Sequence, residues 1–260
     1  MRAGLLSLLF PPHCAACGDL LRFEGFGGGE IPALCPGCAK QWASEKLQSC
    51  GRCGRPVCEC RCLTEELSGA GCAGLCKLVY YINGRQPPVQ NRMLYHMKNT
   101  ADRRLAGFLA AELEAPVRAL LREAGAAPEQ TVLTFVPRSR QAVLRTGTDQ
   151  ALQLARALSA RLGLPLQTAV CRRRNARRSQ KTMRKQERRQ NARRAYRLCR
   201  KTDLHGKTVL LVDDIATTGA SMAAVARLLR RAGASSICCA AVASDDRNQS
   251  LGLRPPGVAQ

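Results

Sequence analysis

The sequence predicts an α/β protein in which a parallel sheet, covered by helices, follows a small cysteine-rich module. Three observations lead to this fold class. Residues 209–212 form an apolar run with the character of a buried strand, and an amphipathic stretch follows at 222–231. Between about residues 77 and 245, short apolar runs alternate with helical patterns, which is typical of βαβ units. Eleven of the 15 cysteines lie between Cys14 and Cys76.

We therefore expect three segments. Residues 1–76 are rich in Cys, Gly and Pro, so their elements should be short and a metal should substitute for a large apolar core. Residues 77–245 should form the α/β domain. Residues 246–260 are polar with two adjacent prolines, and we expect a frayed tail there.

Within the α/β segment, each element follows from its hydrophobic pattern. Pro116 should kink or split the first helix, Asp149 should cap the second, and Gly233 should end the third. Cys238 and Cys239 are most simply buried core thiols. The expected strands are 78–82, 132–136, 164–171, 208–212 and 237–242, and the expected helices are 101–124, 149–162 and 221–232.

An acidic pair and a hydroxyl-and-glycine turn stand between the strand at 208–212 and the helix after it. This arrangement can hold a sugar phosphate, because loop and helix N-terminal N–H groups attract an anion and Gly219 permits close approach. The two carboxylates can accept from ribose hydroxyls or lie near Mg²⁺. Alternatively, the acids and hydroxyls only cap the helix, or the domain is a receiver-type doubly wound one. The candidate site residues are Asp213, Asp214, Thr217, Thr218, Gly219, Ala220 and Ser221.

The charge balance indicates attraction to polyanions. The formal net charge is +22, from 41 Lys and Arg against 19 Asp and Glu, so nucleic acid, an anionic membrane or phosphorylated ligands would all be attracted. A proteome that uses arginine freely would also give a general excess. There is no run of about 18 apolar residues, and residues 5–10 are short for a secretion signal. We expect no membrane span and a reducing cytoplasm with metal-bound thiolates.

Paired cysteines predict structural zinc. Cys14 and Cys17, with Cys35 and Cys38, have the spacing of a tetrahedral Cys₄ zinc ribbon. Disulfides are disfavoured by the expected compartment, and a redox role is disfavoured because no thioredoxin-like βαβ unit precedes the pairs. A second site should begin at Cys50 and Cys53. Its nearest further ligands are Cys58 and Cys60, with Cys62, Cys72 and Cys76 as competitors.

Two basic segments flank the expected phosphate site. Arg138 and Arg140 follow the strand at 132–136 and could hold a pyrophosphate through bidentate contacts, or they form an ordinary basic turn. Residues 172–201 carry 15 Arg or Lys and one acid, Glu187, which indicates a polyphosphate or nucleic-acid surface, or a solvated basic face. Tyr196 is the only aromatic residue there, so binding should be electrostatic and sensitive to salt.

Together these motifs resemble the ComF-type family, the competence-associated phosphoribosyltransferase-like proteins, over nearly the whole chain. The loop at 213–221 is the most specific part, because it is similar to the phosphoribosyl pyrophosphate (PRPP) loop of type I phosphoribosyltransferases. Two positions depart from the family pattern, which usually has Arg at Thr146 and Asn at Asp149. The other matching parts are the four cysteine knuckles from Cys14 to Cys60, Lys98, Val136-Pro137, residues 145–150, Gln180, Glu187-Arg188, Asn191 and Ala195-Tyr196.

The resemblance implies a type I phosphoribosyltransferase fold, a Rossmann-like parallel sheet with flanking helices and a hood, after a double zinc ribbon. It implies PRPP or another phosphoribosyl ligand with Mg²⁺, one or two structural Zn²⁺ ions, Lys98 at the ligand, and displacement at the anomeric carbon of PRPP. The implied role is in DNA uptake or nucleotide salvage. Single-stranded DNA and a competence helicase-type or DNA-processing protein are the further partners. The alternatives are a non-catalytic single-stranded DNA-binding factor and a zinc-ribbon docking protein with a vestigial site.

Overall fold

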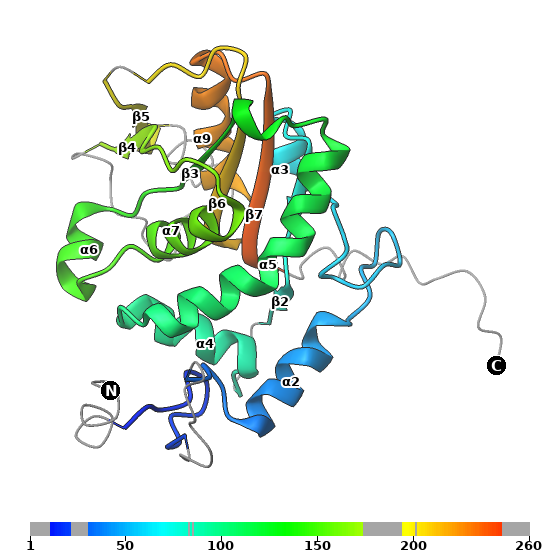
Figure 1. The fold of residues 1–260 in the computed structure, drawn as a ribbon, viewed down its shortest axis with the longest axis vertical. Coiled ribbons are helices and arrows are strands. Elements are labelled where there is room, and N and C mark those ends of the chain that lie inside the picture. The colour runs from blue at the N-terminus through cyan, green and yellow to red at the C-terminus, as the bar shows by residue number, and fades with distance from the viewer. Residues whose placement is uncertain are drawn as a thin grey trace.

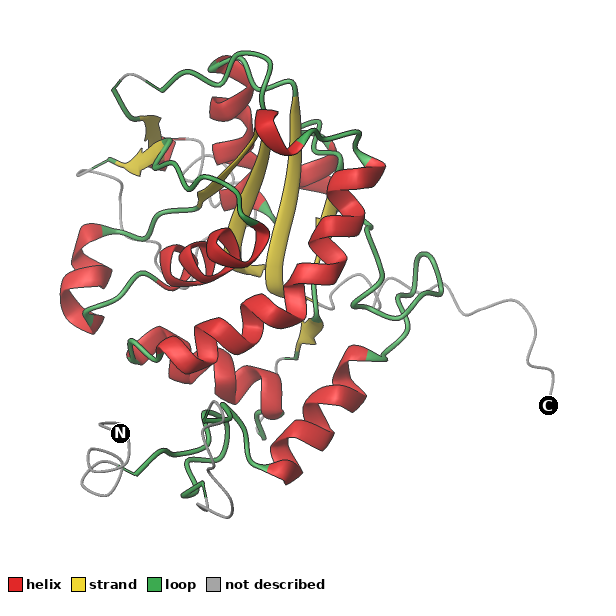
Figure 2. Cartoon of the chain, viewed as in Figure 1, coloured by secondary structure: helices red, strands yellow, loops and turns green. Residues whose placement is uncertain are grey.

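The computed structural model is built around one parallel sheet with helices on both faces (Figure 1). Figure 2 shows how these helices surround the strands. The predicted α/β fold class is therefore confirmed. The structure describes residues 11–21, 31–82, 84, 86–173, 194–200 and 202–245.

The sheet has five strands, and every pairing in it is parallel. β6 lies between β3 and β7, while β1 and β2 follow one another along the outer edge of β7. Parallel neighbours need crossover connections, which helices supply here. The strands are β1 (Gly74–Cys76), β2 (Val79–Tyr81), β3 (Thr131–Phe135), β6 (Thr208–Ala216) and β7 (Ser236–Asp245).

Two apolar cores cover the two faces of the sheet. α5 (Arg103–Glu123) and α7 (Gln150–Leu162) pack on one face, and α9 (Ala220–Arg231) and the short α3 (Glu65–Ser68) pack on the other. Side chains of β6 alternate between them: Leu210 and Val212 belong to the first core, and Val209 and Leu211 to the second. A strand covered on both faces needs the continuous apolar run that the sequence shows.

The three predicted helices are α5, α7 and α9, within one or two residues at each end. Asp149 caps α7 as expected, since its side chain accepts a hydrogen bond from the Leu152 N–H. Of the two effects expected of Pro116, a split of the helix does not occur, and a kink remains a prediction. α5 continues through this residue because its buried side, including Leu113 and Val117, packs on the sheet, and tertiary packing outweighs the lost hydrogen bond.

The expected strand at 164–171 is interrupted. Leu166 forms a single parallel bridge to Leu133 at the edge of the main sheet. The chain then leaves that sheet, and β4 (Val170–Arg172) pairs antiparallel with β5 (Tyr196–Leu198) in a separate ribbon. This ribbon brackets the basic segment, of which residues 174–193 and 201 lie outside the described residues.

The cysteine-rich module is fastened to the α/β domain by α2 (Pro36–Lys46), which lies against α4 (Val89–Asn99) (Figure 1). The Trp42 Nε1–H donates to Glu112 Oε2 of α5 at 3.1 Å, and Lys46 Nζ pairs with the same carboxylate. The Trp42 and Phe108 rings pack with their centroids 5.9 Å apart. Apolar residues of the module thus share a core with α5.

The three-segment division remains a prediction, and the boundary at residue 76 falls inside the sheet, because β1 pairs with Cys238–Ala240. The expected tail, 246–260, lies outside the described residues.

Within the described part of the chain, no helix combines the length and the apolarity needed to cross a membrane. The remaining elements are η1 (Pro128–Gln130) and α6 (Arg140–Thr146).

Candidate phosphate site and metal centres

The candidate phosphate site lies at the carboxyl end of the sheet, where ligands of open α/β sheets bind. β3 ends beside Val212 of β6, and the Val136 N–H still donates to the Val212 carbonyl at 2.9 Å. β6 continues along β7 to Ala216, so Asp213 and Asp214 lie inside the strand. The sequence had indicated a position after the end of the strand. The acids therefore begin where one edge of β6 becomes open.

The two acids are held in different ways. Asp213 is buried, and its Oδ1 accepts the Asp214 N–H at 2.9 Å. Asp214 accepts the Ile215 N–H at 2.8 Å, and its other oxygen lies 3.9 Å from Lys98 Nζ. Burial, together with the negative charge of Asp214, raises the pKa of Asp213 well above the ordinary value for a carboxyl. The last turn of α4 thus brings a cation to the acid pair.

Asp149 is a third carboxyl near this pair, and it organises the neighbouring loop. Its Oδ2 accepts the Arg138 N–H at 2.9 Å, while its Oδ1 accepts from Leu152. Burial raises the pKa of Asp149, although these backbone hydrogen bonds act in the opposite direction. The Asp149 carboxyl group therefore caps α7 and also fixes the backbone of the basic loop.

One of the two arginines of the basic loop forms hydrogen bonds with neighbouring residues of the same chain segment. Arg138 Nη1 donates to Thr146 Oγ1 and to the Thr148 carbonyl, both at 3.1 Å. Arg140 is the exposed first residue of α6, whose N-cap is Ser139. Thr146 is thus a hydrogen-bond partner of Arg138. Pyrophosphate binding by Arg138 and Arg140 remains a prediction.

The turn after β6 leads directly into α9. Gly219 is the N-cap of α9 with φ +75°, a conformation that favours glycine, and it has no side chain with which to cap the helix. The Ala220 N–H donates to Thr218 Oγ1 at 3.3 Å, and the side chain of Ser221 lies near that of Tyr196, whose pKa it lowers against the larger, opposite effect of burial. Thr217 is exposed. The first turn of α9 can therefore direct further N–H groups at an anion.

Tyr196 is a buried residue of the β4–β5 ribbon. Its ring is 3% exposed, and the Arg172 guanidinium carbon lies 5.5 Å from the ring centroid. A ring this buried is not open for base stacking. Instead, through Ser221, it ties the β4–β5 ribbon to the start of α9.

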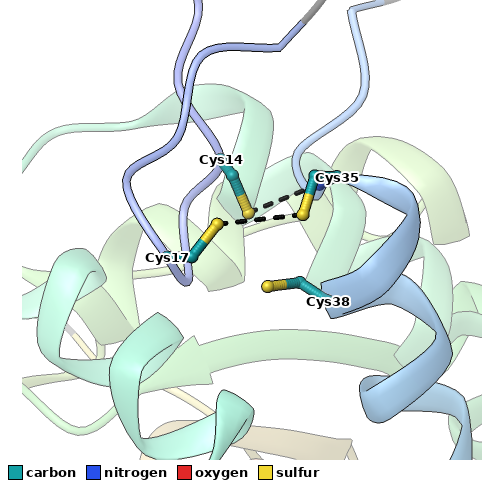
Figure 3. Close-up of side chains that lie close together, drawn as sticks. All are labelled: Cys14, Cys17, Cys35 and Cys38. Atoms are coloured by element: carbon teal, nitrogen blue, oxygen red, sulfur yellow. Dashed lines mark hydrogen bonds between the residues drawn. The ribbon is translucent and has the colours of Figure 1, made fainter.

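Four cysteines form a first candidate metal centre (Figure 3). Their sulfur atoms all lie within 4.8 Å of one another, and the Cys17 and Cys35 sulfurs are 3.8 Å apart. A tetrahedral zinc site with Zn–S distances of about 2.3 Å has S–S edges of about 3.8 Å, so the donor set fits Zn²⁺. The Cys35 N–H also donates to Cys14 Sγ at 3.3 Å. The group is Cys14, Cys17, Cys35 and Cys38.

The second candidate centre corrects the predicted ligand set. Cys50, Cys53, Cys60 and Cys62 form a group with sulfurs within 4.8 Å, and Cys58 is not part of it. The Cys-x-Cys turn brings residues 60 and 62 to the same point, as the Cys62 N–H donates to Cys60 Sγ at 3.3 Å. The charges that act on Cys58 are instead those of Glu59, Lys46 and Glu112. The remaining competitors lie elsewhere: Cys76 Sγ donates to the Pro116 carbonyl, and Cys72 hydrogen-bonds with Cys239.

A buried lysine adjoins this second centre. Lys77 is 3% exposed, and its Nζ donates to Cys60 Sγ at 3.1 Å and to the Cys62 carbonyl at 3.3 Å. A cation at this position offsets part of the charge of a metal tetrathiolate. Lys77 was not among the expected site residues. A single lysine within the apolar run 75–82 was the available sequence signal.

The fold and site together define an α/β protein with a candidate phosphate turn at the carboxyl edge of its sheet. Residues 141–254 match the family model described as "Phosphoribosyl transferase domain". That segment includes the acid pair, the turn and α9, and it covers less than half of the chain. The chain therefore contains a phosphoribosyltransferase-type domain, and its cysteine-rich part lies outside the match.

Comparison with solved structures gives distant similarities. The allosteric regulatory enzyme of purine biosynthesis is 21% identical, with 60% of this chain and 27% of that one covered and a TM-score of 0.33. Glutamine PRPP amidotransferase from B. subtilis, complexed with ADP and GMP, is 18% identical, with 60% and 28% covered and a TM-score of 0.32. TT1426 from Thermus thermophilus is 19% identical, with 61% and 86% covered and a TM-score of 0.32. This chain thus spans less than a third of the first two structures, and a comparison with curated proteins found no match.

Replacing Gly219 with alanine should both strain the turn and create an overlap. The backbone has φ +75°, and an added Cβ would overlap Thr64 Oγ1 and lie 3.0 Å from Leu67 Cγ. Gly163→Ala is the matched control, because Gly163 has φ +69° but open space around its Cβ position. We expect Gly219→Ala to lose about 1–3 kcal/mol more stability than Gly163→Ala in denaturant unfolding. Equal losses would show that the contact with residues 64 and 67 is not tight.

The corrected ligand set can be tested by zinc content. Cys62→Ser should leave one zinc ion per chain, because it removes a sulfur from the second group. Cys58→Ser should retain two, since this cysteine lies outside both groups. Mass spectrometry of the intact metal-loaded proteins measures both values. Loss of a zinc ion from the Cys58 variant alone would restore the original assignment.

The raised pKa of Asp213 predicts a pH-dependent stability. The stability associated with its neutral carboxyl is fully present below the unfolded pKa of about 4 and is lost as the pH rises through the higher folded pKa. Asp213→Asn stays neutral, so above this window its Tm should exceed that of the unliganded wild type, on the order of a few degrees. Melting curves from pH 4 to 8 measure the difference. Asp203→Asn, at an exposed position, is the control, and parallel curves for wild type and Asp213→Asn would contradict the interpretation.

Proposed function

We propose that the chain binds PRPP with Mg²⁺ and acts as a phosphoribosyltransferase in DNA uptake or nucleotide salvage. The observation that carries this proposal is the direct succession of two acids, a glycine turn and the start of α9 at the carboxyl edge of the sheet. This succession lies within the segment that matches the phosphoribosyltransferase domain model. A 5′-phosphate suits the helix start, and ribose hydroxyls suit the acids.

The proposed arrangement assigns one part of PRPP to each element. The turn from Thr217 to Ser221 takes the 5′-phosphate, and Asp213 and Asp214 take the ribose hydroxyls. Mg²⁺, held with the acid pair, would neutralise charge on the pyrophosphate. Lys98 and the loop at residues 138–140 add cationic groups on the pyrophosphate side. These roles fit the ion pair between Lys98 and Asp214.

The reaction would be displacement at the anomeric carbon, with the C1–O bond to pyrophosphate breaking as the acceptor bonds to C1. Its transition state has oxocarbenium character, so placement of the ribose and stabilisation of charge would supply most of the rate. Asp213 and Asp214 place a negative charge beside the ribose. The β4–β5 ribbon, tied to Ser221 by Tyr196, is positioned to limit the access of water.

A second candidate function is binding of single-stranded DNA without catalysis. In this function the zinc module would dock a competence helicase-type or DNA-processing partner. The net charge of +22 favours it, as do the arginines at the described ends of the basic segment, Arg172, Arg173, Arg194 and Arg197. We propose a reducing compartment such as the cytoplasm, because the two groups of four cysteines suit metal-bound thiolates rather than disulfides.

Calorimetry of the zinc-loaded full chain with PRPP and Mg²⁺ tests the proposal. Wild type should bind, and Asp213→Ala with Asp214→Ala should abolish binding, because the ribose and the Mg²⁺ lose their ligands. Asp203→Ala, at an exposed position away from the acid pair, should bind like wild type. Absence of PRPP binding by wild type overturns the proposal. Steep salt-dependent binding of single-stranded DNA in that same protein would favour the second candidate.

A further inference from the structure

The short segment 62–67 connects the second cysteine group with the phosphate turn. It begins at Cys62, one of the four sulfur donors, and ends in α3. α3 packs against α9, and Leu67 belongs to the apolar core on that side of the sheet. The second cysteine group and the phosphate turn, which are far apart in the sequence, are therefore joined by residues 62–67.

Contact between this segment and the turn is close. A side chain at Gly219 would overlap Thr64 Oγ1 and approach Leu67 Cγ, so the backbone of the turn lies directly on these two side chains. Leu67 is fully buried. Thr64 is fixed as the N-cap of α3, because its Oγ1 accepts the Leu67 N–H at 3.3 Å. Thr64 and Leu67, which are fixed by the helix cap and by burial, thus pack against the backbone of the turn and support it.

The other end of the segment is held by the second cysteine group. Arg52, which lies between two of its cysteines, donates from Nη1 to the Leu63 carbonyl at 2.7 Å. Lys77 Nζ bridges Cys60 Sγ and the Cys62 carbonyl. Without a metal, the four sulfurs within 4.8 Å of one another would be held by hydrogen bonds alone, and the segment would lose the anchor that metal ligation gives.

The first cysteine group is attached to a different part of the domain. The carbonyls beside it, of His13 and Pro32, accept hydrogen bonds from Arg104 at the start of α5, at 3.3 and 3.4 Å. Trp42, on the helix that begins with this group, contacts Glu112 and Phe108 of the same α5. This group therefore serves as a comparison within the same chain.

We infer that Thr64 and Leu67 are positioning residues of the phosphate turn, and that the metal of the second cysteine group holds them in place. The inference rests on the proposed PRPP function. Metal in the second group then raises the affinity of the turn for PRPP, and by linkage PRPP raises the metal affinity of that group by the same factor. The first group has no such coupling.

The coupling can be measured without any catalytic assay. Zinc release from the full chain to a chromophoric chelator is followed with and without saturating PRPP and Mg²⁺. At equilibrium with the chelator, one of the two zinc ions should be held about fivefold or more tightly when PRPP is bound. In Cys14→Ser with Cys17→Ser, where only the second group keeps four sulfurs, the remaining zinc should still be protected. In Cys60→Ser with Cys62→Ser, the remaining zinc should be unprotected.

A positioning variant tests the contact itself. Leu67→Ala should keep two zinc ions, bind PRPP at least about fivefold more weakly in calorimetry, and lose the zinc protection. Leu67→Met should restore both, and Leu47→Ala, at an exposed position, should resemble wild type. If wild type does not bind PRPP, the proposed function fails. If wild type binds PRPP but zinc release is unchanged, or Leu67→Ala binds as tightly as wild type, only the coupling is overturned.

Discussion

Burial of β6 on both faces and along both edges is the constraint on which the rest of the structure depends. Its side chains alternate between the core of α5 and α7 and the core of α9, while β3 and β7 occupy its edges as far as Val212. Charged groups are excluded from such a strand. They first become tolerable where β3 ends, which is the position of Asp213 and Asp214. The position of the acid pair is therefore set by the point at which β3 stops covering one edge of β6.

The acid pair lowers the free energy of unfolding, which burial of this core raises. Asp213 is buried next to a second carboxylate, and its pKa is raised because the ionised form is poorly solvated. Lys98 is a basic group near the pair, with its Nζ 3.9 Å from Asp214 Oδ2. An arrangement that disfavours its own charge is suited to a ligand that brings a compensating one, such as a divalent cation with a sugar phosphate.

Cysteine groups replace apolar packing in the N-terminal module, and each is joined to the domain differently. The first is attached to α5 through α2, with Trp42 and Glu112 at the contact. The second receives Lys77 from the chain that links β1 to β2, and its Cys62 leads into α3. A module with little core of its own thus gains order from the domain it covers, and metal ligation by the two cysteine groups would add to it. The second attachment also reaches the phosphate turn.

The sequence by itself determined the features set by short-range pattern: the buried strand 208–212, its acid pair and glycine turn, the three long helices, and the first cysteine group. Periodicity and spacing are local properties, so they can be read without coordinates. Only the tertiary structure decided that Cys62 rather than Cys58 completes the second group and that Lys77 adjoins it. It alone placed α3 behind the phosphate turn. These choices depend on how chain segments distant in sequence approach one another, and side-chain direction at such contacts is fixed by packing rather than by residue order.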